Sequence, residues 1–175
     1  WRDTGYIGRV NEVKKLEQEL RHGRSNSICI NGPGGVGKTA IALKVLQNLI
    51  FENVFDEVFY YSFKSEFLTS GGILVEDTKI TIQTLRDEIN NYFGEKYDDG
   101  ADVVQKVCVC LDNIEDVTVE DSSAFEDFLE ELPASWKVFA TSRLKPNGFK
   151  VVNIDELDEA GCRNLARKYI NIHGQ

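Results

Sequence analysis

The chain has 175 residues, of which 42% are hydrophobic and 28% charged, and its formal net charge is −9 at pH 7. This balance predicts one soluble globular domain with a sizeable core and excludes a disordered or fibrous chain. No apolar run approaches the ~20 residues that a membrane-spanning helix needs, and the N-terminus lacks the basic-then-apolar layout of a secretory signal. The acidic charge argues against a non-specific nucleic-acid surface, which depends on Lys and Arg. We therefore expect a cytoplasmic location, with no membrane or nucleic-acid partner for this domain.

The first predicted element is an amphipathic helix over residues 11–21, because Val13, Leu16 and Leu20 recur at helical spacing. The sequence begins at Trp1 and contains no methionine, so we expect it to be a fragment of a larger multidomain protein.

A glycine-rich run from Gly32 to Thr39 lies between residues 27–31, an apolar stretch that predicts a buried strand, and residues 40–46, which predict a helix. The run has every fixed residue of a phosphate-binding P-loop. Its glycines allow positive φ, so successive N–H groups can surround a phosphate at the start of the helix. Lys38 is expected to reach the β- and γ-phosphates, and the hydroxyl of Thr39 to bind Mg²⁺.

The alternative is a glycine-rich turn without a ligand. We expect ATP or ADP with Mg²⁺, in contact with Gly32, Pro33, Gly34, Gly35, Val36, Gly37, Lys38, Thr39 and Ala40.

The middle of the chain continues the alternation of strands and helices. Residues 55–63 are rich in aromatic side chains and predict a strand, whereas residues 64–79 show no clear period and predict a loop around Gly71 and Gly72. A helix with its apolar face on residues 82–93 is expected to end at Gly94.

The continuous apolar run over residues 107–111 predicts a central parallel strand. Ser123 and Glu126 fit a capping box for a helix that Pro133 stops. The remaining predicted elements are strands over residues 136–141 and 151–154 and a helix from near Asp158 toward Ile172.

This alternation predicts a parallel sheet covered by helices on both faces, which is a three-layer αβα arrangement. The P-loop within it resembles that of P-loop NTPases of the ASCE type, and this resemblance implies a five-stranded sheet in the order 5-1-4-3-2. Ligands bind beyond the carboxyl ends of such strands, so the loops that begin near residues 31, 112 and 142 are expected to share one edge. The four cysteines are predicted to be small apolar core residues rather than metal ligands or disulfides: Cys29, Cys108, Cys110 and Cys162.

Polar residues at this edge are candidates for catalysis. Asp112 closes the third strand in the form of a Walker B segment and can bind Mg²⁺ directly or through water, or it is an acid at the surface. Asn113 can orient a water but cannot accept its proton. Glu115, followed by Asp116, is either a base within reach of that water or a solvated loop carboxylate, and both interpretations stay open.

Arg143 ends the fourth strand in the segment Thr141-Ser142-Arg143. An arginine there can contact a γ-phosphate, which gives a charge-assisted bond that ATP makes and ADP does not. The alternative is an arginine on a surface turn.

Together these segments resemble the nucleotide-binding domain of the STAND class of P-loop ATPases, which includes NB-ARC-like and NACHT-like proteins of immunity, apoptosis and bacterial defence. Residues 6–13 look like the family segment "F-x-G-R-x-x-E-L", which implies that Ile7, Gly8 and Arg9 contact the adenine. Residues 107–113 resemble its Walker B segment and residues 137–143 its "T-T-R" sensor.

The resemblance also divides the chain, because residues 155–160 are similar to the run that opens the helical lid. It implies a nucleotide-binding domain over residues 1–156 and a truncated lid over residues 157–175. The form "L-D-N-x-E" over residues 111–115 looks more like bacterial members, and the amide in place of a second acid argues for slow hydrolysis.

The family implies a signalling switch that couples ADP–ATP exchange to opening and homo-oligomerisation, with flanking effector, winged-helix and sensor domains outside this sequence. Two other classes remain: an AAA+-type motor or loader, and a small-molecule phosphotransferase. A GTPase is disfavoured, because the sequence has no guanine-reading N-K-x-D segment.

Overall fold

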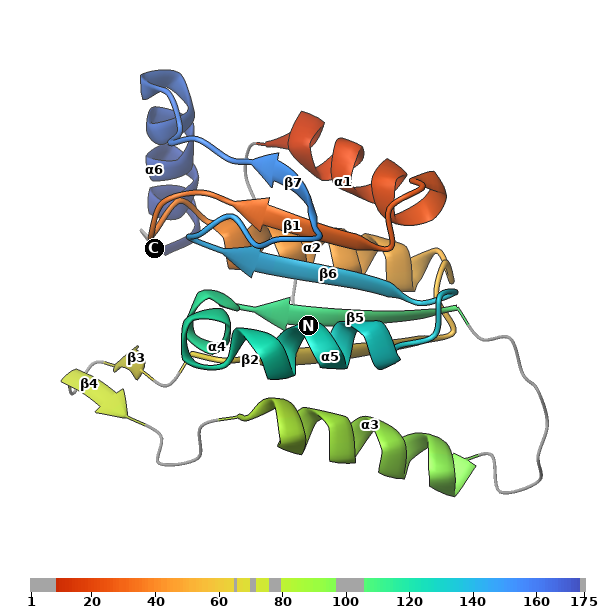
Figure 1. Cartoon of the computed structure of the whole chain (residues 1–175). Coiled ribbons are helices and arrows are strands. Elements are labelled where there is room, and N and C mark those ends of the chain that lie inside the picture. Colours follow the sequence, from red (N-terminus) through yellow and green to blue (C-terminus); the bar gives the residue numbers. More distant parts are fainter. Residues whose placement is uncertain (1–8, 65, 70–71, 76–79, 97–105, 174–175) are drawn as a thin grey trace.

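The computed structural model describes residues 9–64, 66–69, 72–75, 80–96 and 106–173 (Figure 1). Its central element is a five-stranded parallel sheet in the order β2-β5-β6-β1-β7. Numbered along the chain, these strands run 2-3-4-1-5, which is the predicted order 5-1-4-3-2 read from the other edge, so the prediction is confirmed. The strands are β1 (Ser27–Asn31), β2 (Glu57–Ser62), β5 (Val107–Asp112), β6 (Lys137–Ser142) and β7 (Lys150–Asn153).

One face of the sheet is covered by α1 (Val10–His22) and α2 (Lys38–Phe51) (Figure 1). Leu16 of α1 and Ile41 of α2 are buried with Phe139 of β6 in one apolar cluster. Burying a leucine or isoleucine side chain contributes about 1.5–3 kcal/mol, so this cluster fixes both helices on the sheet.

The opposite face is covered by α3 (Ile82–Lys96), α4 (Glu115–Glu120) and α5 (Ser122–Glu131). Their buried side chains, among them Leu85 and Phe128, form a second cluster with the strand residues that alternate to this side. All six residues of β5 are buried, as a central strand covered on both faces requires. Two helical layers therefore enclose the sheet, as predicted.

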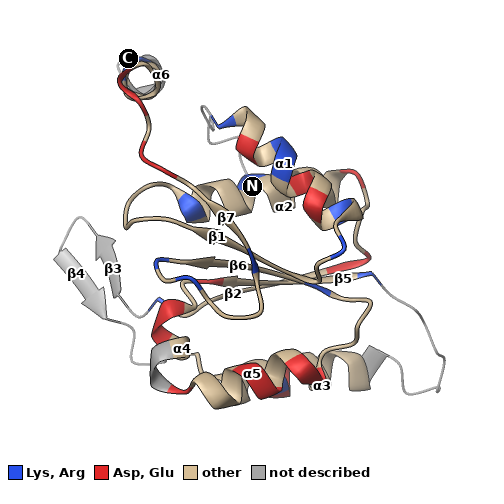
Figure 2. Cartoon of the chain, turned by 45° about the horizontal axis from the view of Figure 1, so that its top comes forward, with Lys and Arg blue, Asp and Glu red and all other residues tan. Residues whose placement is uncertain are grey.

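The last helix, α6 (Glu159–His173), follows β7 and stands away from these layers (Figures 1 and 2). Residues 162–167 are all exposed. Among the described residues, no helix has the length and apolarity to cross a bilayer.

Three local predictions are wrong. Part of the expected loop over 64–79 forms two strands, β3 (Glu66–Thr69) and β4 (Gly72–Val75), because two short runs there contain β-prone residues and pair with each other in antiparallel register. Helix α3 continues through Gly94 to Lys96, since one glycine costs a helix only about 1 kcal/mol. The cap of α5 is Asp121, which accepts a bond from the amide of Ala124, and not the Ser123–Glu126 box.

The cysteine prediction is confirmed for Cys29, Cys108 and Cys110, which are buried free thiols. Burial raises the pKa of Cys29 to about 12, so this thiol stays protonated. Cys162 is exposed, and its predicted core position is wrong because this part of α6 packs on no sheet. Within the described part of the chain, no cluster of three or more His, Cys, Asp and Glu side chains can hold a metal ion.

A Gly32→Ala substitution is expected to destabilise the fold. A Cβ at this position would lie 2.3 Å from the carbonyl oxygen of Ile154, which is backbone and cannot turn aside. At Gly34 a Cβ would meet only the side chain of Arg143, at 3.7 Å. We expect Gly32→Ala to lower the free energy of unfolding by about 1–3 kcal/mol in urea titrations. Gly34→Ala is the matched control, and equal unfolding midpoints for the two variants would contradict the prediction.

Candidate functional site

The loop that follows β1 is anchored to two neighbouring strands. Asn31 is in register with Ser142 of β6, and its side-chain amide donates to the carbonyl of Ser142 at 3.2 Å. The amide of Gly32 donates to the same carbonyl at 3.3 Å, and the amide of Ile154 donates to the carbonyl of Asn31 at 2.7 Å. The loops after β1 and β6 therefore share the edge at which the strands end, as predicted.

The glycines of the loop leave open space in front of the backbone. Gly35 has φ 79° and Gly37 has φ 96°, and a Cβ at either position would meet no atom within 4 Å. Helix α2 begins immediately after Gly37, which has no side chain to cap the first amides. Free amides and the helix dipole favour an anion at this point, so the loop fits a phosphate group.

Lys38 folds back over the loop. Its Nζ donates to the carbonyl oxygens of Gly32 at 2.9 Å and Pro33 at 3.0 Å, and the residue is only 6% exposed. Burial lowers the pKa of Lys38 and the nearby Arg143 lowers it further, whereas the carboxylate of Glu115 opposes the shift. A phosphate in the open space would give this ammonium group a stronger partner than two carbonyls.

Asp112 lies opposite the start of α2. Its Oδ1 accepts bonds from the hydroxyls of Thr39 at 2.9 Å and Thr141 at 2.6 Å, and Ser62 donates to its Oδ2 at 3.4 Å. Two neighbouring ligands of an octahedral Mg²⁺, each ~2.0–2.1 Å from the ion, lie about 2.8–3.0 Å apart. The oxygens of Thr39 and Asp112 already have this separation, so the pair predicted to bind Mg²⁺ fits the ion.

Asn113 turns the chain sharply after β5. It has φ 63°, and its amide donates to the hydroxyl of Thr141 at 3.0 Å. The turn places Glu115 in the first turn of α4, where it is 8% exposed. The interpretation of Glu115 as a solvated loop carboxylate does not fit this burial.

Glu115 and Arg143 form an ion pair across the ends of β5 and β6. The Nε of Arg143 lies 3.2 Å from Oε1 of Glu115, and the amide of Arg143 donates to Oε2 at 3.3 Å. The Nε and Cζ atoms of Arg143 also lie 3.7 Å from the position of a Cβ at Gly34, so the guanidinium lies beside the loop. The structure thus brings together the predicted loop, Asp112, Glu115 and Arg143.

The upstream segment is only partly described, because Ile7 and Gly8 lie outside the described residues. The guanidinium of Arg9 donates to the carbonyl of Asp155 at 2.5 Å and to that of Val36, in the loop, at 3.5 Å. Arg9 therefore joins the loop to the segment after β7, and its contact with an adenine stays a prediction.

Sequence reasoning missed Ser62 and Thr141 as partners of Asp112. Ser62 ends β2 and Thr141 lies next to the end of β6, and both strands neighbour β5. The predicted strand order could therefore have identified both residues as neighbours of Asp112. It also missed Tyr60, whose pKa is raised by burial and by the nearby carboxylate of Asp112.

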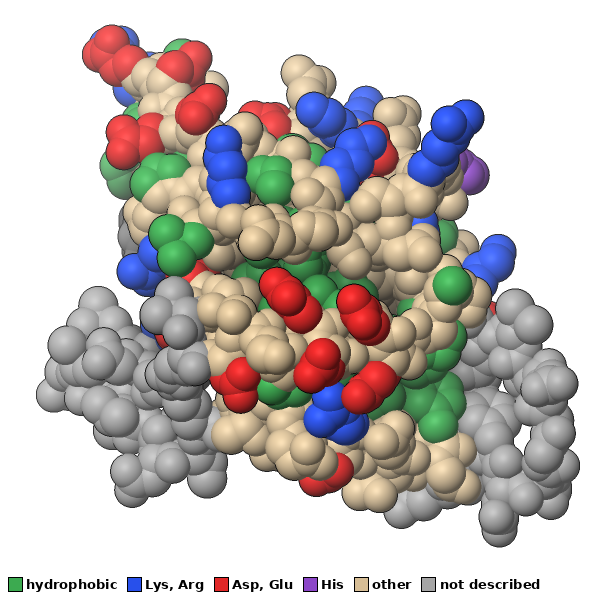
Figure 3. Space-filling model, in the orientation of Figure 1, with side chains coloured by type: hydrophobic (Ala, Val, Ile, Leu, Met, Phe, Trp, Pro, Cys, Tyr) green, Lys and Arg blue, Asp and Glu red, His purple; other side chains and the backbone are tan. Residues whose placement is uncertain are grey.

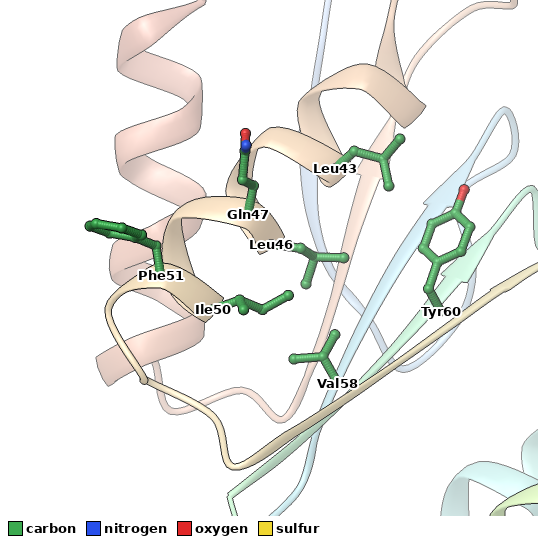
Figure 4. A pocket seen from close by; sticks show the side chains of 7 residues that line it. All are labelled: Leu43, Leu46, Gln47, Ile50, Phe51, Val58 and Tyr60. Carbon is green, nitrogen blue, oxygen red and sulfur yellow. The ribbon is translucent and has the colours of Figure 1, made fainter. Parts of the chain in front are cut away.

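Tyr60 also lines an apolar groove of about 450 Å³ between α2 and β2 (Figure 4). Side chains from the two elements face each other across it, and none of them belongs to the predicted nucleotide site. The lining residues are Leu43, Leu46, Gln47, Ile50, Phe51, Val58 and Tyr60.

No protein-family model matches the sequence, and no curated protein sequence matches it either. Among solved structures, a chain of the structure of Drosophila ORC bound to DNA matches 90% of this chain with a TM-score of 0.55 and 12% identity. The fold is that of a P-loop NTPase. At this identity the likeness shows the fold alone, and this chain spans 43% of the neighbour's length.

The bonds of Asp112 predict the effect of changing Thr141. Thr141→Val keeps the shape of the side chain but removes the donor to Asp112 and leaves the amide of Asn113 without its acceptor. We expect a loss of about 2 kcal/mol in the free energy of unfolding, measured in urea. Thr141→Ser, which keeps the hydroxyl, should lose about 1 kcal/mol or less. Serine and valine variants of equal stability would show that the hydroxyl does not matter.

Proposed function

We propose that this domain is the ATP/ADP-binding switch of a STAND-type signalling ATPase, in which slow hydrolysis resets the switch. The observation that carries the proposal is the position of Arg143 beside the loop at Gly34, with Lys38 and Asp112 on the same edge. A cation at this place adds a contact to the terminal phosphate of ATP that ADP lacks, which is the property a nucleotide switch needs.

The roles proposed for the other residues follow from their chemistry. Thr39 and Asp112 would hold Mg²⁺, and the amides of the loop with Lys38 would bind the phosphates. Asn113 is suited to orient water, and Glu115 is the proposed base because a carboxylate can accept a proton and an amide cannot.

The contact of Arg9 supports coupling between nucleotide and shape. Its guanidinium joins the carbonyl of Val36 in the loop to that of Asp155, which precedes α6, the proposed start of a helical lid. A rearrangement of the loop on phosphate binding would therefore act on the segment that leads to α6.

The differential affinity that Arg143 can supply is too small to move the whole protein between two conformations. Moving a two-state equilibrium from 1:99 to 99:1 requires ~5.5 kcal/mol of differential affinity. A hydrogen bond to a charged group contributes roughly 1.5–3 kcal/mol, so Arg143 alone is insufficient. We propose that the complete protein adds effector, winged-helix and sensor domains and assembles into a homo-oligomer.

A second candidate is an ATPase of the AAA+ type that acts on DNA, because the structural neighbour is bound to DNA. The surface over α5 opposes it, since acidic side chains gather there and would repel phosphates (Figure 3). The exposed acids of α4, α5 and the residue between them are Asp116, Asp121, Glu126, Asp127, Glu130 and Glu131. ATP hydrolysis that DNA stimulates many-fold would favour this candidate.

Lys38→Ala tests whether the loop binds nucleotide. An ammonium group ~4 Å from a phosphate at an effective dielectric of 20 interacts by roughly 4 kcal/mol before desolvation. We expect the variant to lose about a hundredfold or more in affinity for Mg-ATP in titration calorimetry. Lys44→Ala, further along α2, is the control and should bind as the wild type does. An unchanged dissociation constant for Lys38→Ala would overturn the nucleotide site.

The switch itself can be tested on the full-length protein by small-angle scattering. We expect the profile with a non-hydrolysable ATP analogue to show a more open or larger particle than the profile with ADP, because nucleotide state sets the arrangement of the domains. Matching profiles in the two states would remove the proposed coupling while leaving nucleotide binding intact.

A further inference from the structure

Both carboxylate oxygens of Glu115 are engaged by the same residue. Oε1 lies 3.2 Å from the Nε of Arg143, and Oε2 accepts the backbone amide of Arg143 at 3.3 Å. A carboxylate whose two oxygens both hold donors has fewer lone pairs left to accept a hydrogen bond from a water molecule. In this arrangement the proposed base is not free to act.

The two partners differ in how tightly the protein encloses them. The side chain of Glu115 is 10% exposed, whereas that of Arg143 is 60% exposed. The guanidinium can therefore turn into solvent without disturbing the core, but the carboxylate stays at the start of α4. Nε and Cζ of Arg143 lie 3.7 Å from the position of a Cβ at Gly34. A rotation of this side chain is therefore enough to bring the guanidinium to face the open space of the loop.

We propose that the ion pair with Glu115 holds Arg143 away from the phosphate site and that ATP breaks this pair, an inference that rests on the proposed function. We call this ion pair the lock. On ATP binding the guanidinium leaves the carboxylate for the terminal phosphate, and the same movement frees Glu115 to act as the base. ADP has no phosphate at this place and leaves the pair intact.

The charges favour the exchange only with ATP. A terminal phosphate spreads a charge of about −1.5 to −2 over three acceptor oxygens, whereas Glu115 has one negative charge. In the hydrolytic step, the water oxygen bonds to the γ-phosphorus, and the bond from that phosphorus to the β–γ bridging oxygen breaks. ADP leaves with the electron pair, and the proton of the water passes to the freed oxygen of Glu115. The domain thus prepares its base only when there is ATP to hydrolyse.

The lock predicts that Glu115 competes with ATP for Arg143. Glu115→Gln keeps the shape and an acceptor for the backbone amide but removes the charge that holds the guanidinium. We expect it to raise the ratio of affinities for a non-hydrolysable ATP analogue over ADP about three- to tenfold in calorimetry with Mg²⁺. Arg143→Ala should lose the preference for the ATP analogue, and the double variant should equal Arg143→Ala.

Asp116→Asn is the matched control, because it removes an exposed charge next in the chain and should leave the ratio unchanged. A ratio unchanged in Glu115→Gln, or raised equally in Asp116→Asn, would overturn the lock and leave the nucleotide switch standing. Two other outcomes would overturn the proposed function itself. One is a wild-type protein that binds neither nucleotide, and the other is a wild-type protein that, like Arg143→Ala, binds the ATP analogue and ADP with equal affinity.

A measurement on the wild-type chain avoids any effect of the variants on folding. The Nε–H signal of Arg143 in ¹⁵N NMR spectra, assigned by its loss in Arg143→Lys, should shift with the ATP analogue and stay in place with ADP. The same shift with both nucleotides, or with neither, would contradict the exchange of partners.

Discussion

The structure of the site depends on one buried carboxylate. Asp112 is 3% exposed, and the hydroxyls of Thr39, Thr141 and Ser62 donate to its two oxygens. An unpaired charge in this position would be strongly destabilising. The three donors come from α2, β6 and β2, so the carboxylate ties the glycine-rich loop to two neighbours of β5.

Around this carboxylate the charges alternate within a small volume. Lys38 and Arg143 lie on the loop side, and Asp112 and Glu115 lie at the end of β5 and the start of α4. The four formal charges cancel, which lets the domain keep them together at the sheet edge without a ligand. A bound polyphosphate with Mg²⁺ would change that balance of charge. The two cations could then exchange their present partners for phosphate oxygens: Lys38 would leave two backbone carbonyls, and Arg143 would leave a carboxylate.

Much of the framework could be predicted from local patterns. The parallel sheet followed from the alternation of elements, and its strand order from the resemblance to P-loop NTPases. The edge that holds the loop and Asp112 followed from the sheet, because parallel strands end together. The burial of Glu115 could not be predicted, since it depends on the positive φ of Asn113 and on a helix of only six residues. The bond from Arg9 to Asp155 spans 146 positions and leaves no periodic signal. The resemblance to a STAND domain supplied a role for Arg9 but not this contact.

The bond between Arg9 and Asp155 also sets a geometric limit. Residues 154–158 form neither helix nor strand, and α6 begins at Glu159. Four links separate Asp155 from that residue, and at about 3.5 Å per link the chain can extend roughly 14 Å. As long as the guanidinium of Arg9 holds the carbonyl of Asp155, Glu159 must stay within this distance of Asp155. The start of α6 can therefore move only within a short distance of the glycine-rich loop, whatever direction the helix takes.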